Sequence, residues 1–172
     1  MSFQTFERAI VAAPLKRVAA HWNAARGARP MPAWTDIRPS ALAGDLSIIW
    51  SWKYDPVGDR FTGRLAGDAI EAIFGKSFRG AAMRDLFGPE EYDRIFSRHK
   101  RVAVEPCLFR GTGLVFHHLN RYGTGERIIL PLSDGGTEGD GIFGATVYEA
   151  RSGTLPKDVE MAGEREEWFA LG

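Results

Sequence analysis

Hydrophobic residues recur at helical spacing in two segments of the chain. Residues 14–26 place their apolar positions on one stripe, with a proline in the first turn and a glycine just beyond the end. Residues 89–104 have a stronger stripe, again begun by proline, and two early glutamates complement the positive end of a helix dipole. The pattern therefore predicts an amphipathic leading helix and one long central helix.

Segments rich in β-formers on either side of the long helix predict an antiparallel sheet. Residues 67–74 and 81–87 indicate short helices, and turn formers at 55–59 and 123–125 separate strands. Pro131 cannot donate a ladder hydrogen bond, so we expect it at an edge, at a bulge or at an unpaired position. The prediction is an α+β fold in which helices pack over one face of five strands, at 46–54, 60–66, 107–119, 126–133 and 141–149.

The end of the chain mixes aromatic and apolar residues with several glutamates. From Leu155 this pattern predicts a weakly amphipathic terminal helix whose apolar positions are Met161, Trp168 and Phe169. We expect three parts: an N-terminal helix with a connector, a core, and a C-terminal extension, at residues 1–45, 46–150 and 151–172.

Charge and cysteine content exclude several classes of protein. Lysine plus arginine number 22 and aspartate plus glutamate number 22, so no net field draws the 172-residue chain to nucleic acid or to an anionic membrane. No stretch approaches the ~20 apolar residues of a membrane span, and the first residues lack the basic and apolar run of a secretory signal. A single cysteine, Cys107, excludes an internal disulfide framework. We therefore expect a cytoplasmic protein that binds neither nucleic acid nor membrane.

Several short motifs along the chain match a known family. They are Trp22, 31–39, Phe61, 64–67, Phe74-Gly75, Gly80, Asp85-Leu86, 130–133 and Gly144-Ala145. With these motifs and the order of two strands, short helices, a long helix and three strands, about residues 14–150 resemble a family of short bacterial PAS-like proteins. This family is mostly alphaproteobacterial and was once described as a domain of unknown function. The resemblance implies a regulator or a single-domain sensor, and it brings no catalytic site with it.

The fold analogy places a small apolar cavity between the sheet and the long helix. From the helix faces, the side chains expected to line it are Phe74, Phe78, Met83, Ile95, Phe96 and His99. Arg64 in the second strand is a further candidate ligand residue, because a guanidinium near a small interior needs a carboxylate, a carbonyl or an anionic ligand. The alternative is structural pairing of Arg64 with Asp85 or Glu71.

His99 lies on the apolar stripe of the long helix and has two interpretations. In haem-binding PAS domains the iron ligand comes from the equivalent helix, which would make His99 an axial ligand. Alternatively, His99 is a core histidine with one hydrogen-bond partner. His117 and His118 are adjacent in a strand and point to opposite faces, so we expect no metal site built from side chains. Cys107 is expected to be a buried, inert thiol rather than a nucleophile that forms a flavin adduct.

Trp50 and Trp52 share one face of the first strand by period-2 alternation. They either line the cavity or meet the leading helix. In the second case they form, with Leu15, Val18 and Trp22, an apolar surface of the kind on which many PAS domains dimerise. Packing of the leading helix on the sheet within one chain is the alternative.

These observations predict a non-catalytic sensory or regulatory module of the PAS type. We expect it to form a homodimer and to signal in trans through contacts with another protein, with a small-molecule ligand as an option and no required cofactor. The alternatives are a ligand-free interaction adaptor, a sensor that holds haem through His99 or a flavin, and an enzyme on a similar scaffold. No Gly-x-Ser-x-Gly elbow, Walker-type loop or convergent pair of titratable residues in the sequence supports the enzyme.

Overall fold

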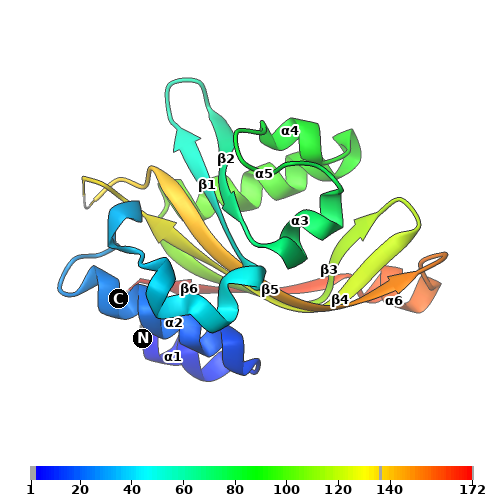
Figure 1. Ribbon diagram of the computed structural model, residues 1–172, viewed down its shortest axis with the longest axis horizontal. Coiled ribbons are helices and arrows are strands. Elements are labelled where there is room, and N and C mark those ends of the chain that lie inside the picture. The colour runs from blue at the N-terminus through cyan, green and yellow to red at the C-terminus, as the bar shows by residue number, and fades with distance from the viewer. Residues whose placement is uncertain (1–2, 136, 172) are drawn as a thin grey trace.

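A six-stranded antiparallel sheet forms the centre of the computed structural model, which describes residues 3–135 and 137–171 (Figure 1). The spatial order of the strands is β2-β1-β5-β4-β3-β6. The predicted α+β class with an antiparallel sheet is thereby confirmed, and the strands number six rather than five. Their bounds are β1 (Ile49–Asp55), β2 (Arg60–Ala66), β3 (Cys107–His118), β4 (Arg121–Leu132), β5 (Gly141–Ser152) and β6 (Glu164–Ala170).

Helices cover both faces of this sheet. On one face, called the inner face here, lie α3 (Asp68–Phe74), α4 (Met83–Leu86) and α5 (Pro89–Val104). The opposite, outer face carries α1 (Phe3–Ala9), α2 (Ala13–Arg26) and the 3-10 helices η1 (Trp34–Asp36) and η2 (Pro39–Ile48). A short helix near the C-terminus, α6 (Lys157–Ala162), lies beside β3. None of the helices within residues 3–135 and 137–171 combines the length and the apolar character needed to cross a bilayer.

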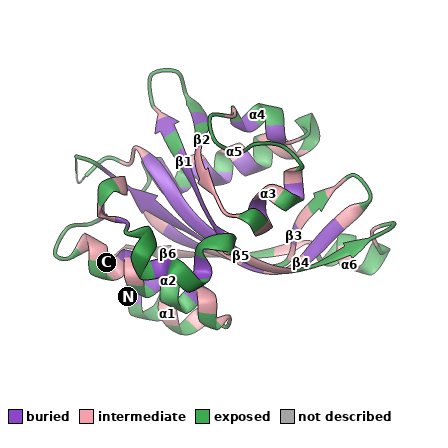
Figure 2. Ribbon diagram, viewed as in Figure 1, coloured by how far each residue is buried: buried purple, intermediate pink, exposed green. Residues whose placement is uncertain are grey.

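Alternation along the strands divides the core into two apolar clusters. In β4, Ile128 and Leu130 belong to the outer cluster with α1 and α2, whereas Ile129 belongs to the inner cluster with α5. In β1, Ile49 is in the outer cluster and Trp50 in the inner one. Figure 2 accordingly shows the central strands buried along much of their length, as in a sheet that is covered on both sides.

The C-terminal segment forms a sixth strand where the sequence suggested a helix. α6 is followed by Gly163, which has a φ of 58°, and β6 then pairs antiparallel with β3, with Phe109 opposite Trp168. Trp168 packs on Phe109 with 4.9 Å between ring centroids, and Phe169 packs on Phe6 with 5.4 Å. The expectation of a helix through Trp168 and Phe169 is therefore wrong, because their partners lie on opposite sides of the sheet.

The turn between β3 and β4 comes earlier in the chain than predicted. It lies at Leu119, which has a φ of 54°, and Asn120, so the strand that follows is longer than expected. Gly123 and Gly125 lie inside that strand, and a Cβ on Gly123 would stand 2.2 Å from the Phe116 ring. These glycines permit close packing rather than a turn.

The apolar stripe of α2 is buried within the chain. Leu15, Val18 and Trp22 are inaccessible to solvent, and the indole Nε1 of Trp22 donates a hydrogen bond of 2.9 Å to a carbonyl of β4. Trp50 and Trp52 point to the inner face instead. These five side chains therefore do not form one exposed surface, because the helix covers the outer face of its own sheet and the two tryptophans lie on the other face.

Pro131 lies in β4 just beyond the point where the ladder to β3 ends, at Ile129. It pairs with Ile142 of β5 on one side only, and its carbonyl is the acceptor for Trp22. On the side of β3 this position has no strand partner among the described residues, as the missing N–H of proline requires.

A buried carboxylate holds the start of α2 on the outer face. Glu126 of β4 accepts hydrogen bonds from the backbone N–H groups of Val11 at 3.0 Å and of Ala12 at 2.7 Å. Arg110 of β3 donates to the same carboxylate at 2.6 Å and also to Glu167 of β6. Three strands and the beginning of α2 thus meet in one ion-paired cluster.

Replacing Glu126 with glutamine should destabilise the chain by about 1–2 kcal/mol, because hydrogen bonds to a charged group are stronger than neutral ones and Arg110 would lose one of its two carboxylate partners. Chemical denaturation followed by circular dichroism measures the change. Glu149→Gln is the matched control, since the Glu149 side chain is 80% exposed. Equal stability of the two variants would contradict an anchoring role for Glu126.

Candidate ligand-binding cavity

A cavity of about 250 Å³ lies on the inner face, between the sheet and helices α3 and α5. Side chains from β1, β3, β4 and β5 form its sheet side, and residues around α6 border one end. Its walls are mainly aromatic and aliphatic, as in most small-molecule sites. The apolar lining includes Trp50, Trp52, Ile70, Ile73, Phe74, Phe78, Leu86, Phe87 and Ile95.

Four of the side chains expected around the cavity lie on its wall: Phe74, Phe78, Ile95 and His99. Met83 and Phe96 lie elsewhere, because Met83 is packed inside the inner cluster and Phe96 stacks on Tyr92, with ring centroids 5.5 Å apart. Trp50 and Trp52, for which the sequence left two positions open, line the cavity.

Arg64 of β2 does not border the cavity. Its guanidinium lies 5.0 Å from the centroid of the Trp34 ring, and its buried Nη1 has no hydrogen-bond partner among the described residues. Burial lowers the pKa of Arg64, and the nearby charge of Asp140 opposes that shift. The guanidinium pairs with neither Asp85 nor Glu71, so the partners suggested by the sequence are replaced by an aromatic face.

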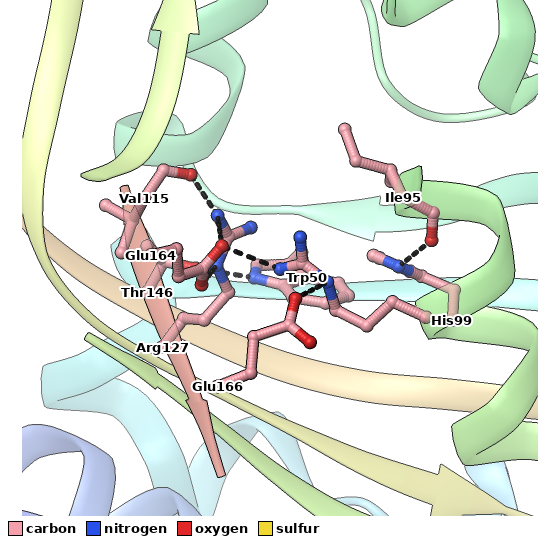
Figure 3. A network of polar contacts seen from close by, with 9 residues as sticks. Trp50, Ile95, His99, Val115, Arg127, Thr146, Glu164 and Glu166 are labelled. Carbon is pink, nitrogen blue, oxygen red and sulfur yellow. Dashed lines mark hydrogen bonds and ion pairs between the residues drawn. The ribbon is translucent and has the colours of Figure 1, made fainter. Parts of the chain in front are cut away.

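His99 of α5 is buried, and the structure settles which of its nitrogens carries the proton. Nδ1 lies 2.7 Å from the carbonyl oxygen of Ile95, which can only accept, so Nδ1 is the donor (Figure 3). Burial first, then the positive charges of Arg98 and Arg127, hold the pKa of His99 well below its ordinary value. The ring is therefore neutral and stacks on Trp50 at 5.4 Å, with an unprotonated Nε2.

Lowering the pH from 7 to 5 should destabilise the chain more than it destabilises a His99→Gln variant. Native His99 stays neutral, whereas the unfolded chain takes up a proton near the ordinary pKa of 6.5. Below that pH the unfolded state binds more protons, so stability falls by up to about 1.4 kcal/mol per pH unit from this group. Denaturant midpoints across this range measure the difference, and identical profiles would show that folded His99 protonates freely.

Haem ligation by His99 stays a prediction. The neutral ring with a free Nε2 lone pair is the form that binds iron. A cavity of about 250 Å³ is, however, smaller than the ~300–1,000 Å³ of ordinary ligand pockets, and a haem macrocycle is a large ligand. The absorption spectrum of the purified protein tests this option directly.

A buried ion-pair network includes two residues of the cavity wall, Arg127 and Glu164. Figure 3 shows the contacts of this network. Arg127 of β4 donates from Nε to Oε1 of Glu164 at 2.6 Å and from Nη2 to Oε2 at 3.0 Å. Arg98 of α5 donates from Nη1 to the same Oε2 at 2.9 Å, and its Nε lies 3.5 Å from Glu166. Nη2 of Arg127 also donates to the carbonyl of Val115. One carboxylate of β6 thus joins α5 and β4 across the inner face.

This network holds two guanidinium groups around one fully buried carboxylate, that of Glu164. Burial, with the positive charge of Arg127, lowers the pKa of Arg98 to about 10, against the opposing charge of Glu164. Nε and Nη2 of Arg98 have no hydrogen-bond partner in the described part of the chain, and its guanidinium lies 5.0 Å from the Phe109 ring. The buried positive charge of Arg98 is therefore balanced mainly by the carboxylate of Glu164.

Arg127 and Glu164 are site residues that were not predicted from the sequence. The strand pattern could have indicated Arg127. Successive side chains of a strand point to opposite faces, so Arg127 points to the same inner face as Ile129, and Ile128 points to the outer face. No local pattern indicates Glu164. The pattern from Leu155 predicts a helix there, and the two arginines that pair with Glu164 lie 37 and 66 residues away in the chain.

Thr146 of β5 supplies a further polar group in the cavity wall. Its hydroxyl oxygen accepts a buried hydrogen bond of 3.0 Å from the indole Nε1 of Trp50 (Figure 3). The hydroxyl proton is left to donate to another group. Thr146 therefore fixes Trp50 and offers one donor to the cavity.

The remaining candidates from the sequence lie at the rim or outside the cavity. His117 and His118, at the end of β3, both border it, after a bulge between Leu114 and Phe116. No group of three or more histidine, cysteine, aspartate or glutamate side chains among residues 3–135 and 137–171 suits a metal ion. Burial raises the pKa of Cys107 to about 11, so its thiol stays protonated near neutral pH.

Comparison with known proteins assigns this arrangement to a family. A family model of the PAS domain matches residues 11–147. The chain belongs to the PAS domain family. The resemblance noted in the sequence is thus confirmed, and no curated protein or solved structure matches the chain.

PAS domains are in general sensory or regulatory modules without catalytic activity. In this PAS domain the helices α3 to α5 and most of the cavity wall lie within the matched residues, whereas α6 and β6 lie beyond them. Glu164 therefore pairs with two arginines of the family core from a segment outside the match.

Proposed function

We propose that this PAS domain is a non-catalytic sensory or regulatory module that binds a small ligand in the inner-face cavity. The observation that carries the proposal is the composition of the wall, in which a mainly aromatic and aliphatic lining is combined with the polar side chains of His99, Thr146 and Arg127. A ligand-free adaptor would be favoured by a filled interior, and a space of about 250 Å³ favours binding instead.

Three polar groups in the wall are placed to orient a ligand. Nε2 of His99 accepts, the hydroxyl of Thr146 donates, and the guanidinium of Arg127 donates. Nδ1 of His99 is bonded to a backbone carbonyl, and a guanidinium acts as a hydrogen-bond donor, so this set supports recognition rather than proton transfer. A few directional groups in an apolar pocket give specificity for one ligand class.

We also propose that the signal passes in trans, to another protein or to a second copy in a homodimer. Glu160 of α6 borders the cavity, while the next residue, Met161, is 87% exposed. Leu119 in the β3–β4 turn is 83% exposed and shares a shallow depression with Glu160. Exposed apolar side chains of this kind mark protein contacts, so a ligand that shifts α6 would change the contact made at this end.

Native mass spectrometry of the protein as purified, followed by denaturing extraction, tests the proposal and reports the oligomeric state. We expect a bound small molecule that is lost in Ile73→Trp, where the larger side chain fills the cavity. Val57→Trp is the control, because Val57 is 97% exposed. If the purified protein has the mass of the chain alone, and no small molecule stabilises it, ligand binding would be overturned and the ligand-free adaptor would be favoured.

A further inference from the structure

Arg127 has donors left over after its contacts within the protein are satisfied. Its Nε donates to Glu164, and Nη2 donates to Glu164 and to the carbonyl of Val115. Nη1 makes no hydrogen bond to any residue that the structure describes, although the side chain is only 14% exposed and lies on the cavity wall. Two N–H groups of a mostly buried cation thus remain available at the cavity.

Glu164 is shared between two arginines and has little acceptor capacity left for a ligand. Its Oε1 accepts from Arg127, and its Oε2 accepts from both Arg127 and Arg98. A positively charged ligand would therefore find this carboxylate already paired, and a buried cation without a partner is strongly unfavourable. The charged group that is still free to bind a ligand inside the cavity is therefore a hydrogen-bond donor, the guanidinium of Arg127.

The other charged residues around the cavity lie at its rim. Arg94 and Glu160 are exposed and Glu91 is half-buried, so water screens all three. Their charges do not decide which ligand is stable inside, where the medium is less polar and a paired charge counts for more. Arg127 is the residue that sets the preferred sign of ligand charge.

We propose, on the basis of the proposed function, that the ligand is a small aromatic or aliphatic carboxylic acid whose carboxylate binds Nη1 of Arg127. Its body would pack against Trp50, Phe74 and Phe78, and the hydroxyl of Thr146 would supply a further donor. A carboxylate oxygen can accept from Nη1, whose two free N–H groups point in different directions. A phosphate carries more charge and more acceptor oxygens, and usually takes several cationic partners.

Isothermal titration with matched pairs of acid and primary amide tests the proposal. Suitable pairs are 3-phenylpropionic acid with 3-phenylpropionamide, and indole-3-acetic acid with indole-3-acetamide, which differ in charge and little in shape. The intact chain should bind the acid of at least one pair about tenfold or more tightly than its amide, the scale of a hydrogen bond to a charged group. The titrations are repeated with Arg127→Gln and with the control Arg94→Gln, which removes an exposed arginine at the rim.

In Arg127→Gln the preference for the acid should disappear, while Glu164 keeps its ion pair with Arg98 and the fold is retained. In Arg94→Gln the preference should persist. Equal binding of acid and amide by the intact chain, or loss of the preference in Arg94→Gln alone, would overturn the inference and leave the ligand cavity standing. Binding of neither member of any pair, by a chain that is also purified without a ligand, would overturn the proposed function itself.

Discussion

Replacing Glu164 with glutamine is expected to destabilise the chain by about 3–5 kcal/mol, the cost of breaking a buried ion pair from one side. The side chain is 0% exposed and is the common partner of Arg98 and Arg127. Glutamine has nearly the same shape, so the loss would come from the charge rather than from packing. Equilibrium denaturation in urea measures it.

Glu166→Gln is the matched control for this experiment. Glu166 lies on the same strand and the same face, 3.5 Å from Nε of Arg98, but its side chain is 34% exposed. Partly solvated pairs contribute little, so we expect a loss below about 1 kcal/mol. Equally small losses in both variants would show that the arginines are compensated without Glu164.

Replacing Trp22 with alanine is expected to destabilise the chain by about 3–5 kcal/mol, as for other large aromatic side chains removed from a core. Trp22 is fully buried in the outer cluster and stacks on Phe3 with 6.2 Å between ring centroids. Alanine would leave a cavity and would also leave the carbonyl of Pro131 without its donor. Thermal and chemical denaturation measure the loss.

Val57→Ala provides the comparison for Trp22, because Val57 is at the surface and its truncation should change stability by less than about 0.5 kcal/mol. A loss below about 1 kcal/mol for Trp22→Ala, with the helix content unchanged, would mean that α2 separates from the sheet at little cost. That result would support a role of α2 in contacts between chains.

The elements with strong local signals could be predicted from the sequence. The bounds of α5 and β2 agree with the expected segments 89–104 and 60–66, because proline and two glutamates begin the helix and a dense turn begins the strand. Phe74, Ile95 and His99 were placed at the cavity for the same reason, since they come from helices whose apolar stripe is visible in the pattern. Phe78, which also lines the cavity, lies in the loop between α3 and α4.

The parts that depend on distant partners could not be predicted in this way. Trp168 and Phe169 are neighbours in sequence, and the local pattern fits a helix or a strand equally well. Only their packing partners, Phe109 and Phe6 on opposite faces of the sheet, identify a strand. Glu164 reaches Arg127 only because the sheet order places β6 next to β3 and β3 next to β4. Periodicity carries no information on that order.

The covering of both sheet faces by helices has a consequence for how the chain can associate through its backbone. A strand added by another molecule must approach an edge, and at β2 the N–H and the carbonyl of Gly63 are already bonded to Ala81 and Gly80. β6 is the other edge, where the side chain of Arg165 is 79% exposed and those of Glu166 and Glu167 are partly exposed. Charged side chains on an edge oppose strand addition, so the segment that completes the cavity also protects the sheet against polymerisation.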